Sequence, residues 1–466
     1  MHDEPISRRS LLRGGLGAAA LVTLSSYDGV TSPPSAAATS TVAANVRVSH
    51  DTYGDHVGPS LAANPRHPEQ LLVACQGSSR PPEFIPTYVS FDAGASWQPG
   101  GRPPQPTAGP AGDDVNIAFD ARGRGYICAT RSGHGAPVTR ANPDANRAVY
   151  VWQTDDGGRS FSKPVTLTAG TYSDHPWLAT GQGQTGAERN VYVAWGAGNS
   201  HTALDLRRSI DGGETFEPPR RILAEASRPS LVSAGPQLAT GPDGLVCAVC
   251  DWTTQQNSAG DMIGQVVAVC STDYGLSFAE PVHLGSESSA IALRGGVRPN
   301  SGPTVAASPN GDALYVAFTK HKPGTAHSDI MVTASHDRGR TWSTAARATP
   351  DDAVIYFQPN LVVDDAGRLA ISAFALAHGR INEVLLISRP RVLRFHPPLR
   401  VTAAPFNPED RTTASRGKYG TWWIGDWQGI AASAGAFHLV WNDTRTGKLD
   451  LFAATVRAGA DGRRAA

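Results

Sequence analysis

The sequence predicts an all-β protein, a β-propeller of seven four-stranded antiparallel blades, and three observations lead to this prediction. An eight-residue turn motif of the form Ser/Thr-x-Asp-x-Gly-x-Ser/Thr-aromatic occurs five times. A strand-start pattern, Pro-x-Leu-Ala or a variant of it followed by a turn and an apolar strand, occurs seven times. The abundance of Gly (49) and Pro (35) is typical of many short strands joined by turns.

Each residue type in the turn motif has a local structural role. The Asp carboxylate can accept hydrogen bonds from the backbone N–H groups just ahead of it, and the Gly can adopt a positive φ without a steric penalty. The terminal aromatic residue starts the next strand and should pack inward. We therefore interpret the five motif aspartates as structural and not catalytic; they are Asp92, Asp156, Asp211, Asp273 and Asp337.

The order of the two patterns predicts the blades and the way in which the ring closes. After each of the first five strand pairs, a third strand runs into a turn motif and then into an outer strand. The sixth and seventh units lack the motif, and the seventh provides only three strands. We expect residues 46–49 to supply the missing outer strand, so that residues 39–466 form a single propeller domain. A ring of six blades is the alternative.

Residues 1–38 resemble a twin-arginine export signal. The segment Ser-Arg-Arg-Ser-Leu-Leu at residues 7–12 precedes an apolar run at residues 16–24, and three alanines at residues 36–38 offer a cleavage site. The apolar run is too short to cross a bilayer. We therefore expect a secreted or extracytoplasmic protein without a membrane span.

Net charge and cysteine content limit the classes of function that the chain can have. The formal net charge is zero, which argues against nucleic acid as a partner. We expect a monomer that needs no cofactor and has no metal site. The odd number of cysteines excludes a fully paired disulfide framework. We expect all five cysteines to be buried as small apolar residues, and the alternative is that Cys250 faces Cys270 across adjacent strands. The five cysteines are Cys75, Cys128, Cys247, Cys250 and Cys270.

In a four-stranded meander, the turn motifs join strands three and four, so a ligand site is expected at the opposite rim over the central channel. The loops that lead into the first strands carry Tyr-Gly-Asp-His at residues 53–56 and Tyr-Ser-Asp-His at residues 172–175. They make His56 and His175 candidate ligand-binding residues; the alternative is that these Asp-His pairs cap the strand starts. Metal ligation is disfavoured, because adjacent residues in a strand point to opposite faces.

The stretch from residue 418 to residue 431 is the most distinctive part of the chain, because it combines aromatic residues with a carboxylate. Tyr419 and Asp426 are the candidate catalytic residues here, and Asp55 would be a second carboxylate facing Asp426 across the channel. Apolar sugar faces stack on indoles, which makes Trp423 a binding candidate, while arginines hold carboxylates bidentately. The candidate arginines are Arg131, Arg298 and Arg445. The alternative is that Trp423 packs in the core and Arg445 pairs with Asp443.

The five turn motifs resemble the Asp-box, or bacterial neuraminidase repeat, of the sialidase superfamily. The resemblance implies an exported glycoside hydrolase of the exo-α-sialidase type acting on a carbohydrate or glycoconjugate, with the Asp-boxes on the face away from the active site. It also implies an arginine triad, a Tyr nucleophile assisted by a Glu, and an Asp acid. Val57 stands where the family's Arg-Ile-Pro-x-Leu motif has its first arginine. A propeller that binds glycans or proteins without turnover is the alternative.

Overall fold

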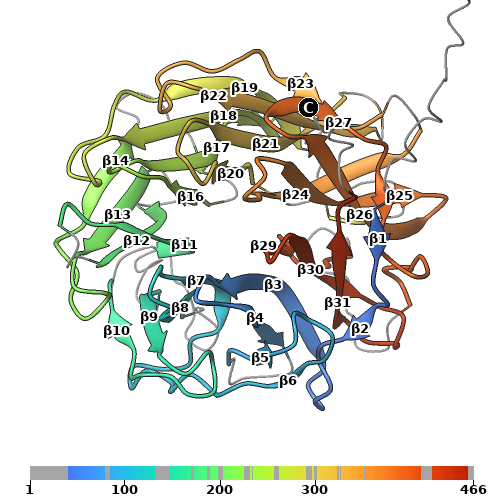
Figure 1. Cartoon of the computed structure of the whole chain (residues 1–466), viewed down its shortest axis with the longest axis horizontal. Helices are drawn as coiled ribbons and strands as arrows, with labels where there is room; N and C mark the ends of the chain where they lie inside the picture. The colour runs from blue at the N-terminus through green and yellow to red at the C-terminus, as the bar shows by residue number, and fades with distance from the viewer. Residues whose placement is uncertain are drawn as a thin grey trace, which may run out of the picture.

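The computed structural model describes residues 40–78, 84–131, 147–168, 173–185, 189–197, 203–224, 231–232, 235–256, 262–289, 296–298, 302–322, 325, 327–350, 353–410 and 422–459. Within these ranges every regular element is a β-strand. The strands form seven antiparallel sheets arranged around a common axis (Figure 1). The predicted seven-bladed, all-β propeller is therefore confirmed. No helix in the described ranges is long and apolar enough to cross a membrane.

The sheets follow one another along the chain, and each begins with the strand nearest the axis (Figure 1). Blades 1 to 3 contain β3 (Asp55–Asn64), β4 (His67–Ser78), β5 (Thr87–Ser90), β6 (Gln98–Pro99), β7 (Asp113–Phe119), β8 (Gly125–Thr130), β9 (Val149–Thr154), β10 (Val165–Thr166), β11 (Ser173–Gln182), β12 (Arg189–Ala197), β13 (Ala203–Ser209) and β14 (Arg220–Ala224). Blades 4 and 5 contain β15 (Leu231–Val232), β16 (Gln237–Thr240), β17 (Val246–Gln256), β18 (Met262–Ser271), β19 (Val282–Ser289), β20 (Thr304–Ala307), β21 (Leu314–His321), β22 (Ser328–Ser335) and β23 (Ala346–Arg347). Blades 6 and 7 contain β24 (Ile355–Val363), β25 (Leu369–Ala377), β26 (Arg380–Arg389), β27 (Val392–Phe395), β28 (Leu399–Arg400), β29 (Gly429–Ser433), β30 (Ala436–Asp443) and β31 (Asp450–Arg457), with β1 (Thr41–Val42) and β2 (Val46–Arg47) added from the N-terminal side.

The middle strands are buried on both faces, because each blade packs between two neighbours. Every residue of β8 and of β9 is buried, and their side chains alternate between two different apolar clusters. Trp152 packs toward blade 1, whereas Val151 packs toward blade 3. The core is thus a ring of interfaces between blades, which explains why these strands are continuously apolar and do not alternate with polar residues.

The turn motifs adopt the geometry that their residues predict. Asp156 Oδ1 accepts hydrogen bonds from the backbone N–H groups of Arg159 and Ser160, both at 2.9 Å, and from the Thr154 hydroxyl at 2.8 Å. Gly158 has a φ of 94°, and a Cβ there would lie 2.6 Å from a methyl group of Leu72 in the preceding blade. The motif therefore closes its own turn and also docks that turn onto the neighbouring blade.

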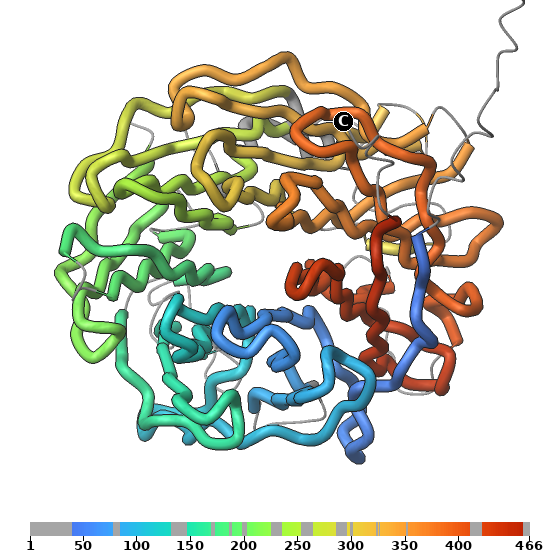
Figure 2. The backbone as a smooth tube through the Cα atoms, viewed as in Figure 1, coloured from blue at the N-terminus to red at the C-terminus, as the bar shows by residue number. Residues whose placement is uncertain are grey.

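The chain closes the ring as predicted. Val46 pairs with Ala453 and Arg47 with Phe452, so β2 adds to the outer side of β31, and β1 extends this pairing. Figure 2 shows the N-terminal segment, in blue, running beside the C-terminal blade, in red. At this closure the buried Asp450 carboxylate binds the Arg47 guanidinium at 2.8 Å and accepts a hydrogen bond from Ser49 at 2.9 Å.

The cysteine prediction is wrong for two of the five residues. Cys247 on β17 and Cys270 on β18 form a disulfide, whereas Cys250 lies opposite Val267. The pairing register decides the outcome, because it places Cys247 directly across from Cys270. Cys75, Cys128 and Cys250 are buried free thiols, as expected of small apolar residues.

Candidate functional site

One equivalent residue per blade surrounds the mouth of the central channel. In blades 1 to 6 it stands three residues before the Leu, or its equivalent, of the strand-start pattern, and in blade 7 it stands four residues before Ile430. In four blades a β-bulge contains it. The seven residues, here called the mouth ring, are Gly58, Asp114, His175, Gly235, Gly302, Gln358 and Asp426. Three of them are glycines, so the reactive side chains come from blades 2, 3, 6 and 7.

The backbone of the mouth ring is strained at three non-glycine positions. Asp114, His175 and Gln358 have φ values of 53°, 48° and 52°, in the left-handed region that such residues seldom adopt. Strain of this kind costs about 1–3 kcal/mol per residue and is concentrated at functional sites. The bulges that contain these three residues interrupt the alternation of their strands at the channel mouth.

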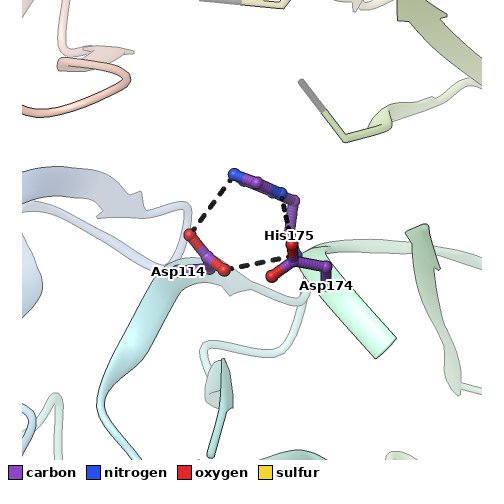
Figure 3. A group of neighbouring side chains, drawn as sticks. All are labelled: Asp114, Asp174 and His175. Carbon is purple, nitrogen blue, oxygen red and sulfur yellow. Dashed lines mark hydrogen bonds and ion pairs between the residues drawn. The ribbon is translucent and has the colours of Figure 1, made fainter. Parts of the chain in front are cut away.

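Asp114, Asp174 and His175 form a compact group at the mouth, here called the Asp–His cluster (Figure 3). His175 Nε2 lies 3.6 Å from Asp114 Oδ1, and His175 Nδ1 lies 3.5 Å from Asp174 Oδ2. Arg147 forms an ion pair with the other oxygen of Asp174. The expectation that adjacent Asp174 and His175 point to opposite faces is wrong, because the β-bulge interrupts the alternation of the strand.

Burial and neighbouring charge change the protonation of the cluster. Burial alone would lower the pKa of His175, but the carboxylates of Asp114 and Asp174 outweigh it and raise that pKa to about 10. Burial also raises the pKa of Asp114 well above its usual value, and the neighbouring carboxylates of Asp113 and Asp174 add to this. The cluster consequently holds a proton at neutral pH beside the channel.

The donor types in the Asp–His cluster are those that bind hard or borderline cations, and the three candidate ligand atoms lie within 4.8 Å of one another. A metal ion would need a neutral imidazole, and it would compete with Arg147 for Asp174. The raised pKa of His175 therefore favours a role in proton transfer over metal ligation.

The mouth opens into a narrow pocket whose walls combine His175 of the cluster with aromatic side chains. His175, Asp426 and the indoles of Trp177 and Trp427 line it together with three prolines. The Trp427 ring packs edge-on against Trp177, with 6.0 Å between centroids, and against His175 at 6.1 Å. Beneath it, the channel widens into a chamber lined by side-chain amides, among them Asn116, Gln237, Asn360 and Gln428.

The C-terminal stretch brings the predicted Asp426 to this pocket, and two other predicted residues, Trp423 and Arg298, contact its carboxylate. Asp426 Oδ1 accepts a hydrogen bond from Trp423 Nε1 at 2.8 Å, and the Arg298 guanidinium lies 3.9 Å from the same oxygen. Trp423 also packs against the core of blades 6 and 7, so it both fills space and orients Asp426. Tyr419 lies outside the described residues.

Four other predicted residues have partners away from this pocket. His56 is fully buried and contacts the carboxylates of Asp51 at 3.0 Å and Asp450 at 3.6 Å, which places it in the ring closure. Asp55 accepts a hydrogen bond from the Leu449 backbone N–H at 3.2 Å, again at the closure.

The remaining arginines are engaged locally. Arg445 forms an ion pair with Asp443 and stacks over Phe452 at 4.4 Å, which matches the structural alternative considered for it. Arg131 donates a hydrogen bond to the Ala108 carbonyl. Neither residue lines the mouth pocket.

Two residues that line the pocket, Trp177 and Trp427, were not among the sequence candidates. Asp114 contacts His175 but does not line the pocket. A signal for them exists in the repeats: Asp114 occupies the position before the strand-start pattern in blade 2, as His175 does in blade 3. Trp427 occupies the first position of that pattern in blade 7, and Trp177 the second in blade 3. Alignment of the seven repeats on this pattern would have selected all three.

Comparison with known proteins shows the fold and little beyond it. No family model and no curated protein sequence matches the chain. An ulvan lyase of polysaccharide lyase family PL25 superposes with a TM-score of 0.55 at 12% identity, covering 88% of this chain and 95% of that one. A protein of unknown function from Dyadobacter fermentans DSM 18053 gives 0.51 at 13% identity, covering 90% and 99%. A Hadza microbial sialidase gives 0.43 at 18% identity, covering 68% and 63%, which is too low to carry an argument.

Proposed function

We propose that the chain is a glycan-processing enzyme that cleaves a glycosidic bond in the mouth pocket. The observation that carries the proposal is that His175 of the proton-holding Asp–His cluster, the Asp426 carboxylate and two indoles line one pocket. Indole faces suit the apolar faces of sugars, and a proton donor opposite a carboxylate suits glycosidic bond cleavage. The ulvan lyase, which shares the fold, acts on a polysaccharide and so supports a glycan as the substrate class.

The roles follow from position and charge. The imidazolium of His175 faces the pocket and donates its proton to the departing glycosidic oxygen. Asp426, held by Trp423, stabilises the positive charge that develops on the sugar ring or activates a water molecule. Asp114 and Asp174 retain the proton on His175 until it is transferred.

The narrower form of the proposal is an exo-α-sialidase. Its support is the five Asp-boxes, together with Arg298 beside Asp426, where a guanidinium would meet an acidic substituent. Of the three candidate arginines, Arg298 is the one near the pocket, and Val57 occupies the position of the family's first arginine. A sialoside should therefore be tested as a substrate together with other glycosides.

The test is turnover by residues 39–466 of a panel comprising a fluorogenic α-sialoside, neutral aryl glycosides, and acidic and neutral polysaccharides. We expect at least one substrate to be cleaved, and we expect His175→Gln to reduce kcat by about 100-fold or more, as removal of a general acid does. Arg340→Ala, an exposed change on the Asp-box rim, is the matched control.

A result without turnover, but with glycan binding that Trp427→Ala abolishes, would assign the chain to the second candidate function, a glycan-binding propeller. The indole pair at the mouth favours this candidate over protein binding, because stacked aromatic side chains recognise sugar rings directly.

We also propose that the protein is exported through the twin-arginine pathway. The support is the motif at residues 7–12, which lies outside the described residues. Replacement of both Arg8 and Arg9 by Lys should retain the full-length chain in the cytoplasm, as immunoblots of cell fractions would show. Unchanged export of that variant would rule the pathway out.

A further inference from the structure

A second pocket lies on the same rim as the mouth, at blade 6. Its volume is about 300 Å³, and its lining residues are Val297, Leu376, His378, Gly379, Arg380, Asn407, Pro408 and Glu409. The turn between β25 and β26 forms one side, and in a four-stranded meander this turn shares its rim with the start of the first strand. The pocket therefore faces the same side as the Asp–His cluster.

One wall separates the two pockets. Residues 296–298 and 422–426 run side by side, since Trp422 N donates to the Gly296 carbonyl at 2.6 Å and Arg298 N donates to the Trp422 carbonyl at 2.9 Å. Val297 on this wall lines the second pocket, whereas the adjacent Arg298 reaches Asp426 in the mouth pocket. A ligand longer than one sugar can therefore cross the wall and occupy both.

The second pocket is rigid on the side that carries its cation. His378 and Gly379 have φ values of 50° and 73°, and Ala377 pairs with Arg380 across them, which is the geometry of a tight two-residue hairpin turn. Arg380 is exposed and forms no ion pair with any residue in the described ranges. Its guanidinium is thus available to a ligand at a fixed place on the rim.

The remaining lining suits a sugar ring. Val297 and Leu376 are buried and close the floor of the pocket, and the amide of Asn407 adds a polar group. Glu409 Oε1 accepts a hydrogen bond from Trp422 Nε1 at 3.0 Å, so this carboxylate is held in place and can accept from a sugar hydroxyl through its other oxygen. The exposed Arg380, which has no ion pair among the described residues, favours a sugar that carries an anionic group.

We infer that this second pocket is a subsite for an anionic sugar residue, and that the chain binds an acidic oligosaccharide across both pockets. Cleavage of the bound oligosaccharide rests on the proposed function. Binding at the second pocket does not require turnover and can be measured separately. A uronate carboxylate and a sugar sulfate offer the same chemistry to Arg380.

The test is calorimetric titration of residues 39–466 with ladders of two to six sugars. The three ladders are oligogalacturonates, which carry carboxylates, κ-carrageenan oligosaccharides, which carry sulfates, and neutral cello-oligosaccharides. The variants are Arg380→Ala and, as the matched control, Arg340→Ala on the opposite rim, where the arginine is equally exposed.

We expect at least one acidic ladder to bind more tightly than the neutral one, and the affinity to rise with length. Arg380→Ala should weaken binding of the tetramer by about tenfold or more and leave the dimer unchanged, since a hydrogen bond to a charged group is worth about that factor. The acidic series whose binding Arg380→Ala weakens identifies the anionic group, carboxylate or sulfate.

Two outcomes would overturn the inference: no preference for either acidic ladder, or an Arg380→Ala effect that is independent of length or equal to that of Arg340→Ala. Length-dependent acidic binding without turnover of any substrate would leave the subsite in place and refute only the proposed enzymatic function.

Discussion

Gly235 in blade 4 lies against the side chain of His175 in blade 3, so closely that a Cβ atom on Gly235 would stand 2.2 Å from the Cβ of His175. Both residues belong to the mouth ring, at equivalent positions of adjacent blades. The glycines of the ring are therefore part of the site, because at this position the absence of a side chain makes room for the imidazole of the neighbouring blade.

Replacement of Gly235 by Ala should displace His175. The φ of Gly235 is 72°, so the variant would suffer backbone strain in addition to the contact. Gly435→Ala is a matched control, since its φ is 73° and a Cβ there meets nothing within 4 Å. We expect Gly435→Ala to lower the free energy of unfolding by about 1 kcal/mol and Gly235→Ala by about 1–3 kcal/mol more. Only Gly235→Ala should reduce turnover, and equal effects of the two variants on unfolding and rate would show that the contact is unimportant.

The Asp–His cluster should make stability fall as the pH rises. The folded-state pKa of His175 is raised to about 10 from an ordinary value of 6.5, so its contribution is complete below pH 6.5 and is lost between pH 6.5 and about pH 10. The raised pKa of Asp114 acts in the same direction. Urea denaturation at pH 6, 8 and 10 should show a loss on the order of a few kcal/mol in the wild type and a smaller loss in His175→Gln. Identical slopes for the two proteins would contradict the assignment of the proton to this cluster.

The parts of this molecule that sequence predicts well are those whose hydrogen bonds are local. The aspartates of the turn motifs bond to residues within four positions of themselves, so the motif alone specifies the turn. The outer strand at residues 46–49 could be predicted because the seventh unit visibly lacked one.

The contacts within the candidate site could be predicted only in part, because they depend on the pairing register of the strands. The structure brings Asp426, Arg298, Trp423 and His175 to one rim, but the contact between Asp174 and His175 depends on a β-bulge that strand alternation does not anticipate. His56 carries the same Tyr-x-Asp-His pattern as His175, yet it is buried at the ring closure, because Gly58 and not a histidine occupies the mouth-ring position in blade 1. The disulfide likewise depends on which residues of β17 and β18 face each other.

The disulfide should stabilise the fold without affecting the site. Cys247 and Cys270 are separated by 23 residues, and a loop of that size corresponds to about 3 kcal/mol of stabilisation by the chain-entropy argument. We expect the double variant Cys247→Ala/Cys270→Ala to have a lower Tm than the wild type and an unchanged kcat. The Tm of this variant should not change when a reductant is added. Cys75→Ala, which removes a buried free thiol, should leave the reductant sensitivity intact. A wild-type Tm that does not change on reduction would refute the prediction.

The Asp-boxes should contribute stability but no catalysis. Asp156→Ala removes a carboxylate that accepts two backbone hydrogen bonds and two from hydroxyl groups, and it should lower the free energy of unfolding by about 1–3 kcal/mol while kcat is unchanged. Although burial opposes it, the hydrogen bonds from Ser160 and Thr154 lower the pKa of Asp156, so its contribution is present above pH 4 and is lost as the pH falls through the folded-state value. The difference in unfolding free energy between wild type and variant should therefore shrink as the pH falls below about 4. A variant that unfolds like the wild type at pH 7, or that loses turnover while remaining folded, would place Asp156 in the reaction and not in the scaffold.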